Sequence, residues 1–288
     1  MTNLRWAIGD VEVYQIIELE AGPLIQSIIK PATPERIREI RWLYPYFADE
    51  AGNLRAVVQC FLIRSGDKSI LIDTCIGNDK THTDVPEWAR LHTDFLEQLA
   101  QIGVKPADVN VVACTHLHND HVGWNTRLDG ERWVPTFPNA EYLFVRQEYE
   151  YWVQRPENQI ADDRAAFDES VSPIIKAGLA RLVDADHRIG SGVRFVPSPG
   201  HTPAHVCVVI ESGNQCALIS GDIMHHPCQV AHTEWECDCD ALPKQAAATR
   251  QRFLGDIADT DTLLIGSHFA NPVSGRVVRA NGQLALEV

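Results

Sequence analysis

The sequence predicts a mixed α/β (α+β) fold in which two β-sheets pack face to face with helices outside. Apolar segments typical of strands fall in two batches along the 288 residues, and amphipathic helical segments follow each batch. Four apolar segments also lead into an aspartate or a histidine, namely Asp73, His116, Asp222 and His268. If these strand ends gather at one edge of the sandwich, the four polar side chains share one groove.

The first half of the chain alternates strands and a helix. Strands are predicted at residues 11–18, 56–64 and 69–73. Residues 87–102 carry apolar side chains at intervals of three and four and end at Gly103, which predicts an amphipathic helix. His82 and His92 lie near this helix, and we expect both to be solvated and not to bind a ligand.

An arm at about residues 22–53 separates the first two strands. Pro23, Pro31 and Pro34 interrupt it, and a short helix is predicted from residue 34 or 35 to about residue 43. The arm also carries an aromatic group, which consists of Trp42, Tyr44, Tyr46 and Phe47. This group either packs on the core as a cover, lines the substrate entrance, or forms the contact of a homodimer.

The second half of the chain contains shorter predicted elements. Strands are predicted at residues 140–145, 181–183, 193–196, 206–211 and 216–220, with a last strand at 262–265. Helices are predicted at about residues 147–154, 163–177 and 243–258, and a loop follows Asn125 as far as Pro138.

The main chemical motif follows the buried strand that ends near Ala113. Residues 116–121 read His-Leu-His-Asn-Asp-His, three histidines and an aspartate within six positions. Residues two apart in an extended segment point the same way, so His116 and His118 can face one point while Asp120 and His121 turn to a second. This arrangement suits metal coordination, whereas the alternative is a solvated polar loop.

Two further segments carry candidate site residues. His201 stands at the tip of a tight loop, because Pro and Gly residues surround it at 197–203. His205 begins the next strand, and we expect a buried histidine that is structural or supports the ligands. Asp73 follows the strand at 69–73, where its carboxylate either orients a metal-binding histidine or caps the next loop.

Composition excludes several classes of function. The formal net charge is −14 and the chain has no Lys/Arg cluster, so nucleic acid is not an expected partner. No run of 18 apolar residues occurs and the N-terminus lacks a signal pattern, so we expect a soluble protein without membrane contact. Eight cysteines are too few for a disulfide scaffold, which favours a reducing cytoplasm. Cys237 and Cys239, with Cys228, lack the usual zinc-knuckle spacing and are expected to be ordinary thiols.

Together these motifs resemble the metallo-β-lactamase-fold hydrolase superfamily. The matching positions are His116-x-His118-x-Asp120-His121, His201 in Pro-Gly-His-Thr-Pro, Asp222 in Ser-Gly-Asp, and His268, with Asp73 as the first of five motifs in order. The resemblance implies a four-layer αββα sandwich of two mixed β-sheets flanked by helices. It further implies a single domain over residues 1–288, whose N-terminal arm at about 22–53 covers the active-site groove.

The resemblance also implies two divalent metal ions per chain. His116, His118 and His201 are the implied ligands of the first ion, and Asp120, His121 and His268 those of the second; Asp222 would bridge the two, with Asp73 behind the ligands. Imidazole and carboxylate ligands suit Zn²⁺, our first expectation, and also Mn²⁺, Fe²⁺ or Co²⁺. Two such ions would hold a bridging hydroxide near neutral pH.

The implied function is hydrolysis of a small ester or lactone, and the nearest resemblance is to lactonases and methyl-parathion-hydrolase-like esterases. Asp222 favours these groups over true β-lactamases, which usually carry Cys or Ser there. The predicted catalytic residues are Asp120 as proton donor, Asp222 and His225. His225 departs from the lactonase pattern, which has tyrosine there, so it either donates a hydrogen bond to the substrate carbonyl or has a structural or solvated role. Thioesters, phosphotriesters and β-lactams are alternative substrates, and a mononuclear iron oxidoreductase similar to persulfide dioxygenases is an alternative of another class.

Overall fold

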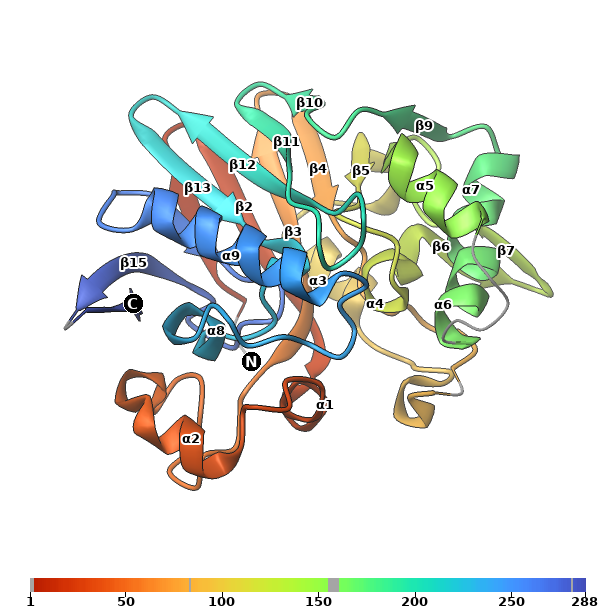
Figure 1. Ribbon diagram of the computed structural model, residues 1–288. Coiled ribbons are helices and arrows are strands. Elements are labelled where there is room, and N and C mark those ends of the chain that lie inside the picture. The colour runs from red at the N-terminus through yellow and green to blue at the C-terminus, as the bar shows by residue number, and fades with distance from the viewer. Residues whose placement is uncertain (1–2, 83, 155–160, 281) are drawn as a thin grey trace.

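Two seven-stranded mixed sheets form the centre of the protein. The computed structural model, drawn in Figure 1, describes residues 3–82, 84–154, 161–280 and 282–288. The first sheet has the order β1 (Arg5–Ile8), β2 (Val11–Glu20), β3 (Val57–Ser65), β4 (Lys68–Ile72), β5 (Val111–Ala113), β8 (Glu141–Val145) and β9 (Ala180–Val183). The second has the order β10 (Arg188–Gly190), β11 (Val193–Pro197), β12 (Val206–Ser212), β13 (Gln215–Ile219), β14 (Leu263–Ile265), β15 (Ser274–Ala280) and β16 (Gln283–Glu287).

The alternation of side chains along each strand divides the core into layers. Ile70 and Ile72 of β4 belong to one buried cluster with Ile219 of β13, which fills the space between the two sheets. Leu71 and Leu218 point the other way and join a second cluster that includes helix residues. Both faces of these central strands are therefore buried, which explains why they read as continuous apolar runs in the sequence.

Helices lie outside the sheets, with α9 along one side and α5, α6 and α7 grouped near β9 (Figure 1). The helices are α1 (Gly22–Ile28), α2 (Pro34–Glu39), α3 (Phe95–Gln101), α4 (Asn119–Val122), α5 (Arg146–Val153), α6 (Ala161–Ala166), α7 (Ser172–Lys176), α8 (Cys228–Ala231) and α9 (Pro243–Ile257). Short 3₁₀ turns are η1 (Arg41–Leu43), η2 (Pro86–Trp88), η3 (Pro106–Asp108), η4 (Gly123–Asn125) and η6 (Gly221–Ile223), and η5 (Phe167–Val171) is π-helical. In the described part of the chain no helix has the length and apolar character that a bilayer span requires.

The prediction of a helix at residues 87–102 is wrong for the first half of that range. The structure has η2, then an irregular stretch, then α3. The irregular stretch bonds to an earlier loop: the Arg90 N–H donates to the Lys80 carbonyl at 2.8 Å, and the Thr93 N–H donates to Asn78 Oδ1 at 2.7 Å. These distant acceptors replace the helical ones, and Arg90 adopts a positive φ of 54°.

Other differences from the predicted elements lie at the ends of the chain and in its loops. Helix α1 occupies part of the arm that the prolines suggested was broken, and α7 continues α6 through the π-helical η5. The predicted loop after Asn125 contains a hairpin of β6 (Thr126–Asp129) and β7 (Arg132–Pro135). The strand at 262–265 is not the last, because β15 and β16 form an antiparallel hairpin beyond it. These strands are short or exposed on one face, so their apolar pattern is weak.

Parallel pairing of the central strands brings the polar strand ends together. Strand β4 pairs in parallel with β5 in the first sheet, and β13 pairs in parallel with β14 in the second. The carboxyl ends of each parallel pair lie at the same edge. Asp73, the loop that contains His116, the turn that contains Asp222, and the segment that contains His268 all follow these four strands.

The aromatic residues of the arm differ in how far they are buried. Phe47 is fully buried and its ring contacts those of Phe269 and His226 at centroid distances of 6.1 and 6.4 Å. Tyr44 and Tyr46 are about half exposed, at 52% and 49%. Phe47 thus acts as a cover over the core.

Lys80 is a buried cation outside the motif, and it provides a test of the packing. Its Nζ donates to Thr126 Oγ1 at 2.7 Å and lies 3.5 Å from the centre of the Trp133 ring. Burial lowers the pKa of Lys80 to about 7, although Glu169 and Asp79 oppose this. In the unfolded chain the pKa of Lys80 is about 10.4, so between about pH 7 and pH 10.4 the unfolded chain binds more protons than the folded chain.

We therefore expect Lys80 to make the free energy of unfolding rise with pH above about 7, by up to about 1.4 kcal/mol per pH unit. Lys80→Met should lose this component, whereas Lys68→Met, at an exposed site on β4, should keep it. Urea unfolding of the three proteins between neutral and alkaline pH measures the difference. Equal slopes for the wild-type protein and Lys80→Met would contradict the prediction.

Candidate metal centre

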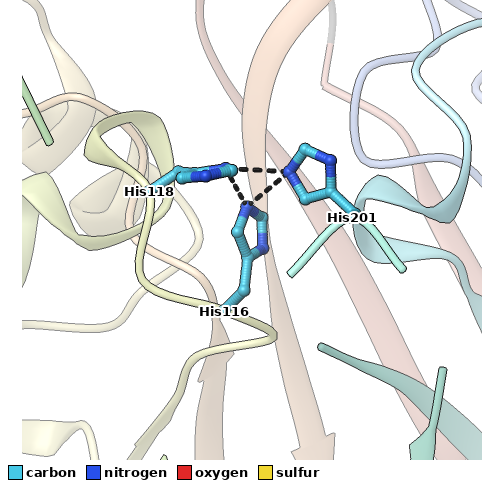
Figure 2. Close-up of side chains that lie close together, drawn as sticks. All are labelled: His116, His118 and His201. Atoms are coloured by element: carbon cyan, nitrogen blue, oxygen red, sulfur yellow. Dashed lines mark hydrogen bonds between the residues drawn. The ribbon is translucent and has the colours of Figure 1, made fainter. Parts of the chain in front are cut away.

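Three histidine rings from two distant segments meet at the edge of the sandwich (Figure 2). His116 and His118 follow β5, whereas His201 lies in the loop between β11 and β12. His118 Nδ1 lies 2.9 Å from His116 Nε2 and 2.8 Å from His201 Nε2, and the two Nε2 atoms are 3.2 Å apart. Figure 2 shows the three rings pointing toward one another, so that one cation could contact all three nitrogens.

A second group lies beside the first. Asp120 and His121 are in α4 and His268 follows β14. Asp120 Oδ1 lies 3.6 Å from His121 Nε2, and Asp120 Oδ2 lies 3.5 Å from His268 Nε2. Each residue offers a ligand atom within 4.8 Å of the others, which is the arrangement that a second cation requires.

Asp222 lies between the two groups. Its Oδ2 is 3.5 Å from His201 Nε2 and 3.9 Å from His116 Nε2 on one side, and 3.3 Å from His121 Nε2 on the other. Its Oδ1 is 3.2 Å from His268 Nε2. All seven residues that the motifs pointed to are therefore brought together, with Asp222 in contact with both groups.

The far nitrogen of several site histidines is held by a fixed partner. A carboxylate or a carbonyl can only accept a hydrogen bond, so the nitrogen that faces it carries the proton and the other ring nitrogen keeps a lone pair. The bonds are His121 Nδ1 to Asp73 Oδ2 at 2.9 Å, His201 Nδ1 to Asp240 Oδ1 at 2.9 Å, and His268 Nδ1 to the Val57 carbonyl at 3.0 Å.

These fixed rings provide a test of whether the site fits metal ions. In His121 and His268 the other ring nitrogen, Nε2, faces the Asp222 carboxylate at 3.3 and 3.2 Å, so a positive charge, either a proton or a metal cation, is needed between them. His121 Nε2 and Asp222 Oδ1 are both buried and have no hydrogen-bond partner among the described residues. Imidazole nitrogens and carboxylate oxygens are the donors that divalent transition metals bind. The residues present therefore fit divalent metal ions.

The electrostatics of the cluster agree with this interpretation. Burial lowers the pKa of His116 and of His201 well below the usual histidine value, and neighbouring histidines lower it further, so both rings are neutral at pH 7. Burial also opposes a charge on His121, but Asp222 and Asp120 raise its pKa well above the usual value. Burial opposes ionisation of Asp222, yet His121 and His268 hold its pKa well below the usual range. The carboxylates thus stabilise positive charge here.

His205 positions the backbone of Asp222 and lies outside the ligand groups. The Asp222 N–H donates to His205 Nε2 at 2.9 Å, so the proton of this ring is on Nδ1, which donates to Ser198 Oγ at 2.8 Å. Gly221 has a φ of +50°, and a Cβ there would lie 2.5 Å from His205 Nε2. Glycine is therefore required for the ring to reach the Asp222 backbone.

A cleft of about 160 Å³ opens onto the ligands. Its apolar residues include Leu24, Ile25 and Ile28 of α1 together with Val85 and Trp88, and its acidic residues include Asp84, Asp162 and Asp163. The N-terminal arm thus contributes to the cleft through α1. None of the arm's four aromatic residues is among the described residues that line the cleft.

His225 lies next to the ligand groups. Its Nε2 is 3.2 Å from Asp222 Oδ2 and 3.4 Å from Cys239 Sγ, and the ring stacks on that of His268 at a centroid distance of 5.9 Å. Its Nδ1 is buried without a hydrogen-bond partner among the described residues. His225 therefore faces the same centre as the ligands.

The prediction for His82 is wrong, because this residue is 6% exposed and its Nδ1 lies 3.2 Å from Asp162 Oδ2. Local sequence gave no sign that a segment 80 residues away would cover it. His92 is exposed, as expected.

Residues 55–261 match the family described as the metallo-beta-lactamase superfamily. The chain belongs to this superfamily. An N-acyl homoserine lactonase of Bacillus cereus is 25% identical over 174 residues, which cover 56% of this chain and 61% of that protein. Metallo-beta-lactamase domain-containing protein 1 of Xenopus laevis is 27% identical over 208 residues, or 72% of this chain and 70% of that protein. The match thus spans less than two thirds of the length of the lactonase.

Solved structures of the metallo-β-lactamase fold superimpose on almost the whole chain. The dizinc quorum-quenching lactonase AidC, solved with a product, gives a TM-score of 0.79 at 21% identity and covers 99% of this chain and 96% of its own. The hydrolase AbOPH gives a TM-score of 0.81 at 23% identity, with 99% and 97% covered. These similarities extend the shared fold to the N-terminal arm and the C-terminal hairpin.

Three supporting residues of this superfamily member had no distinctive signal in the sequence. Glu148 of α5 accepts from the Leu117 N–H at 3.3 Å and from Thr202 Oγ1 at 2.7 Å, which connects the two segments of the three-histidine group. Asp240 accepts a hydrogen bond from His201 Nδ1, and the buried Arg250 of α9 donates a hydrogen bond to the Ile223 carbonyl in the turn that contains Asp222. Each is a single charged residue in an ordinary helix or loop, and only the tertiary structure identifies it.

Asp73 provides a test of the supporting contacts in this metallo-β-lactamase centre. Besides His121, its carboxylate accepts from the Thr115 N–H at 2.7 Å, and its φ is 59°, which asparagine tolerates. We expect Asp73→Asn to weaken zinc binding about 10-fold to 100-fold, because the amide no longer holds the His121 ring as strongly. Competition with a chromophoric chelator measures the affinity. Asp67→Asn, in the exposed turn after β3, is the control, and equal affinities for both variants would contradict the prediction.

Proposed function

We propose that this protein is a hydrolase of small esters or lactones that uses two divalent metal ions, with Zn²⁺ the expected ion. The observation that carries the proposal is the position of Asp222 in contact with two ligand groups at one edge of the sandwich. Membership of the superfamily and the lactonase among the relatives support it. The cleft is small and mainly apolar, which favours a small substrate with an apolar part.

The metal ions, when bound, would supply Lewis acidity and a water acidic enough to lose its proton near neutral pH. His116, His118 and His201 would hold one ion, and Asp120, His121 and His268 the other, with Asp222 between them. The carboxylate of Asp120 lines the cleft and is the group that can take a proton and pass it to the leaving oxygen. The apolar residues of α1 would orient the substrate and exclude water.

A substrate panel tests the proposal. The zinc-loaded protein is assayed with aryl esters, lactones, thioesters, phosphotriesters and β-lactams, and its metal content is measured. We expect two metal ions per chain and turnover of an ester or lactone, and His118→Ala should lose metal and turnover together. No turnover of any substrate with metal bound, or one iron per chain with oxygen consumption, would contradict the proposal.

His225 is expected to contact the substrate and to leave the metal in place. His225→Phe keeps a planar ring but removes the hydrogen-bonding nitrogens, so we expect turnover to fall about 100-fold with unchanged metal content. His232→Phe is the control, because His232 pairs with Glu234 and is not among the described residues that line the cleft. Unaltered turnover of His225→Phe would return His225 to a structural role.

The expectations for partners and location remain part of this proposal. The substrate is a small molecule and neither nucleic acid nor a membrane is a partner, consistent with the net charge of −14. We further propose a cytoplasmic protein, and a homodimer in which the half-exposed Tyr44 and Tyr46 take part.

A further inference from the structure

Two cysteines lie next to each other at the edge of the metal cleft. Both are free thiols, and Cys237 Sγ lies 2.7 Å from Cys239 Sγ. Cys239 lines the cleft, whereas Cys237 is 2% exposed. A small molecule that enters the cleft therefore meets Cys239 first, with Cys237 directly behind it.

A tight turn holds the two sulfurs in this position. The Asp240 N–H donates to the Cys237 carbonyl at 3.1 Å, and the Cys237 N–H donates to Asp240 Oδ2 at 3.2 Å. Asp240 itself is fixed by His201 Nδ1. With both ends of the turn bonded and one residue between the cysteines, the backbone keeps the two cysteines close to each other.

The spacing of the sulfurs discriminates between two uses of a thiol pair. Two thiolates on one tetrahedral zinc ion, each at about 2.3 Å from the metal, lie about 3.8 Å apart. The sulfurs of a disulfide lie about 2.05 Å apart. The separation of 2.7 Å is shorter than the contact of two non-bonded sulfur atoms and is nearer to the disulfide. The geometry favours oxidation over shared metal binding.

We propose that Cys237 and Cys239 form a reversible oxidation site that takes small hydroperoxides. One sulfur of the pair, as the thiolate, attacks one peroxide oxygen, the O–O bond breaks, and a sulfenic acid forms with release of the first molecule of water (or alcohol). The other sulfur then attacks the sulfenic sulfur, which forms the S–S bond and releases a second molecule, water. Two thiols lose two electrons and two protons, and the peroxide gains them. A small thiol restores the pair by exchange.

The turn connects this site to the metal centre and to the cleft wall. Asp240 holds His201, and the Asp238 N–H donates to the Ile28 carbonyl of α1 at 2.9 Å. Lys30 also pairs with Asp238 at 2.9 Å. Disulfide formation pulls on this turn, so we expect it to change the rate of hydrolysis; this second effect rests on the proposed function, whereas formation of the disulfide does not.

The experiment treats the full-length, metal-loaded protein with hydrogen peroxide in small excess and measures free thiols, intact mass and peptide maps. We expect loss of two of the eight thiols, a decrease in mass of two hydrogen atoms, a Cys237–Cys239 cross-link, and full recovery with dithiothreitol. Cys237→Ser and Cys239→Ser should each prevent the cross-link. Cys216→Ser, at a half-buried site on β13, should not.

Two results would overturn the proposal. One is that both thiols remain free, or that Cys239 is oxidised to a sulfonic acid without a cross-link. The other is that the untreated protein holds a stoichiometric thiophilic metal that is lost in both Cys237→Ser and Cys239→Ser. Because mass and thiol counts do not depend on hydrolysis, the oxidation site can be tested even if the protein hydrolyses no ester or lactone. A disulfide that forms and reverses supports the site whatever its effect on turnover.

Discussion

Replacement of Asp222 with asparagine is expected to lower the metal content and to reduce hydrolysis about 1000-fold. Asp222 is 3% exposed and contacts ring nitrogens of both ligand groups. The neutral amide removes the negative charge that lies between the two groups, so metal cations held there would lose the anion that stabilises both of them. Elemental analysis and the turnover of the best substrate of the panel measure the two effects.

Asp259→Asn is the matched control for this experiment. Asp259 pairs with Arg279 on the surface, away from the cleft residues, so its replacement should change neither quantity. If Asp222→Asn keeps both metal ions and most of its activity, the two groups do not act through a shared carboxylate. The proposed function would then lose the observation on which it rests.

Replacement of Arg250 with methionine is expected to destabilise the protein by about 3–5 kcal/mol. The guanidinium is fully buried and donates to the Ile223 carbonyl at 2.6 Å and to the Thr233 and Trp235 carbonyls at 2.8 and 2.7 Å. Methionine has a similar length but leaves these carbonyls without their donor, and it removes the positive charge that lies 3.9 Å from Asp240 Oδ2. Because Ile223 belongs to the same turn as Asp222, weaker metal binding should accompany the lower stability.

Arg252→Met provides the control on the same helix. Arg252 is exposed, so its replacement should change the free energy of unfolding by less than about 0.5 kcal/mol. Urea unfolding and zinc titration of the three proteins measure both quantities. Equal stability of Arg250→Met and Arg252→Met would show that α9 does not support the site through its buried arginine.

The sequence was most informative where burial and chemistry coincide. Apolar runs such as Ile70–Ile72 are buried on both faces, so they identify strands, and the polar residue after each run marks the end at the shared edge. His116 and His118 could be predicted because three histidines and an aspartate within six residues rarely occur by chance, and His201 because Pro and Gly residues place it at the tip of a tight loop. The position of Asp222 between the groups was predicted only through the resemblance, because it depends on how the second sheet packs against the first.

Other features depended on contacts between distant segments. Residues 89–94 have helical apolar spacing, but the side chain of Asn78 and the backbone carbonyl of Lys80 take their N–H groups. Polar residues surround His82 in the sequence, yet His82 is buried in the structure, where its Nδ1 contacts Asp162 Oδ2. The pairing of Cys237 with Cys239 beside His225 depends on a turn that Asp240 and the contacts of Asp238 with α1 and Lys30 hold in place.

Both sheets supply ligand residues to the metal centre, which affects how long the folded protein persists. His116, His118, Asp120 and His121 belong to the first sheet's segments, whereas His201, Asp222 and His268 belong to the second's. Any ion bound by both sets fastens the two halves of the polypeptide to each other, and its binding energy is added to that of folding. When metal is scarce, proteases would then degrade the protein faster, in addition to the loss of its hydrolysis activity.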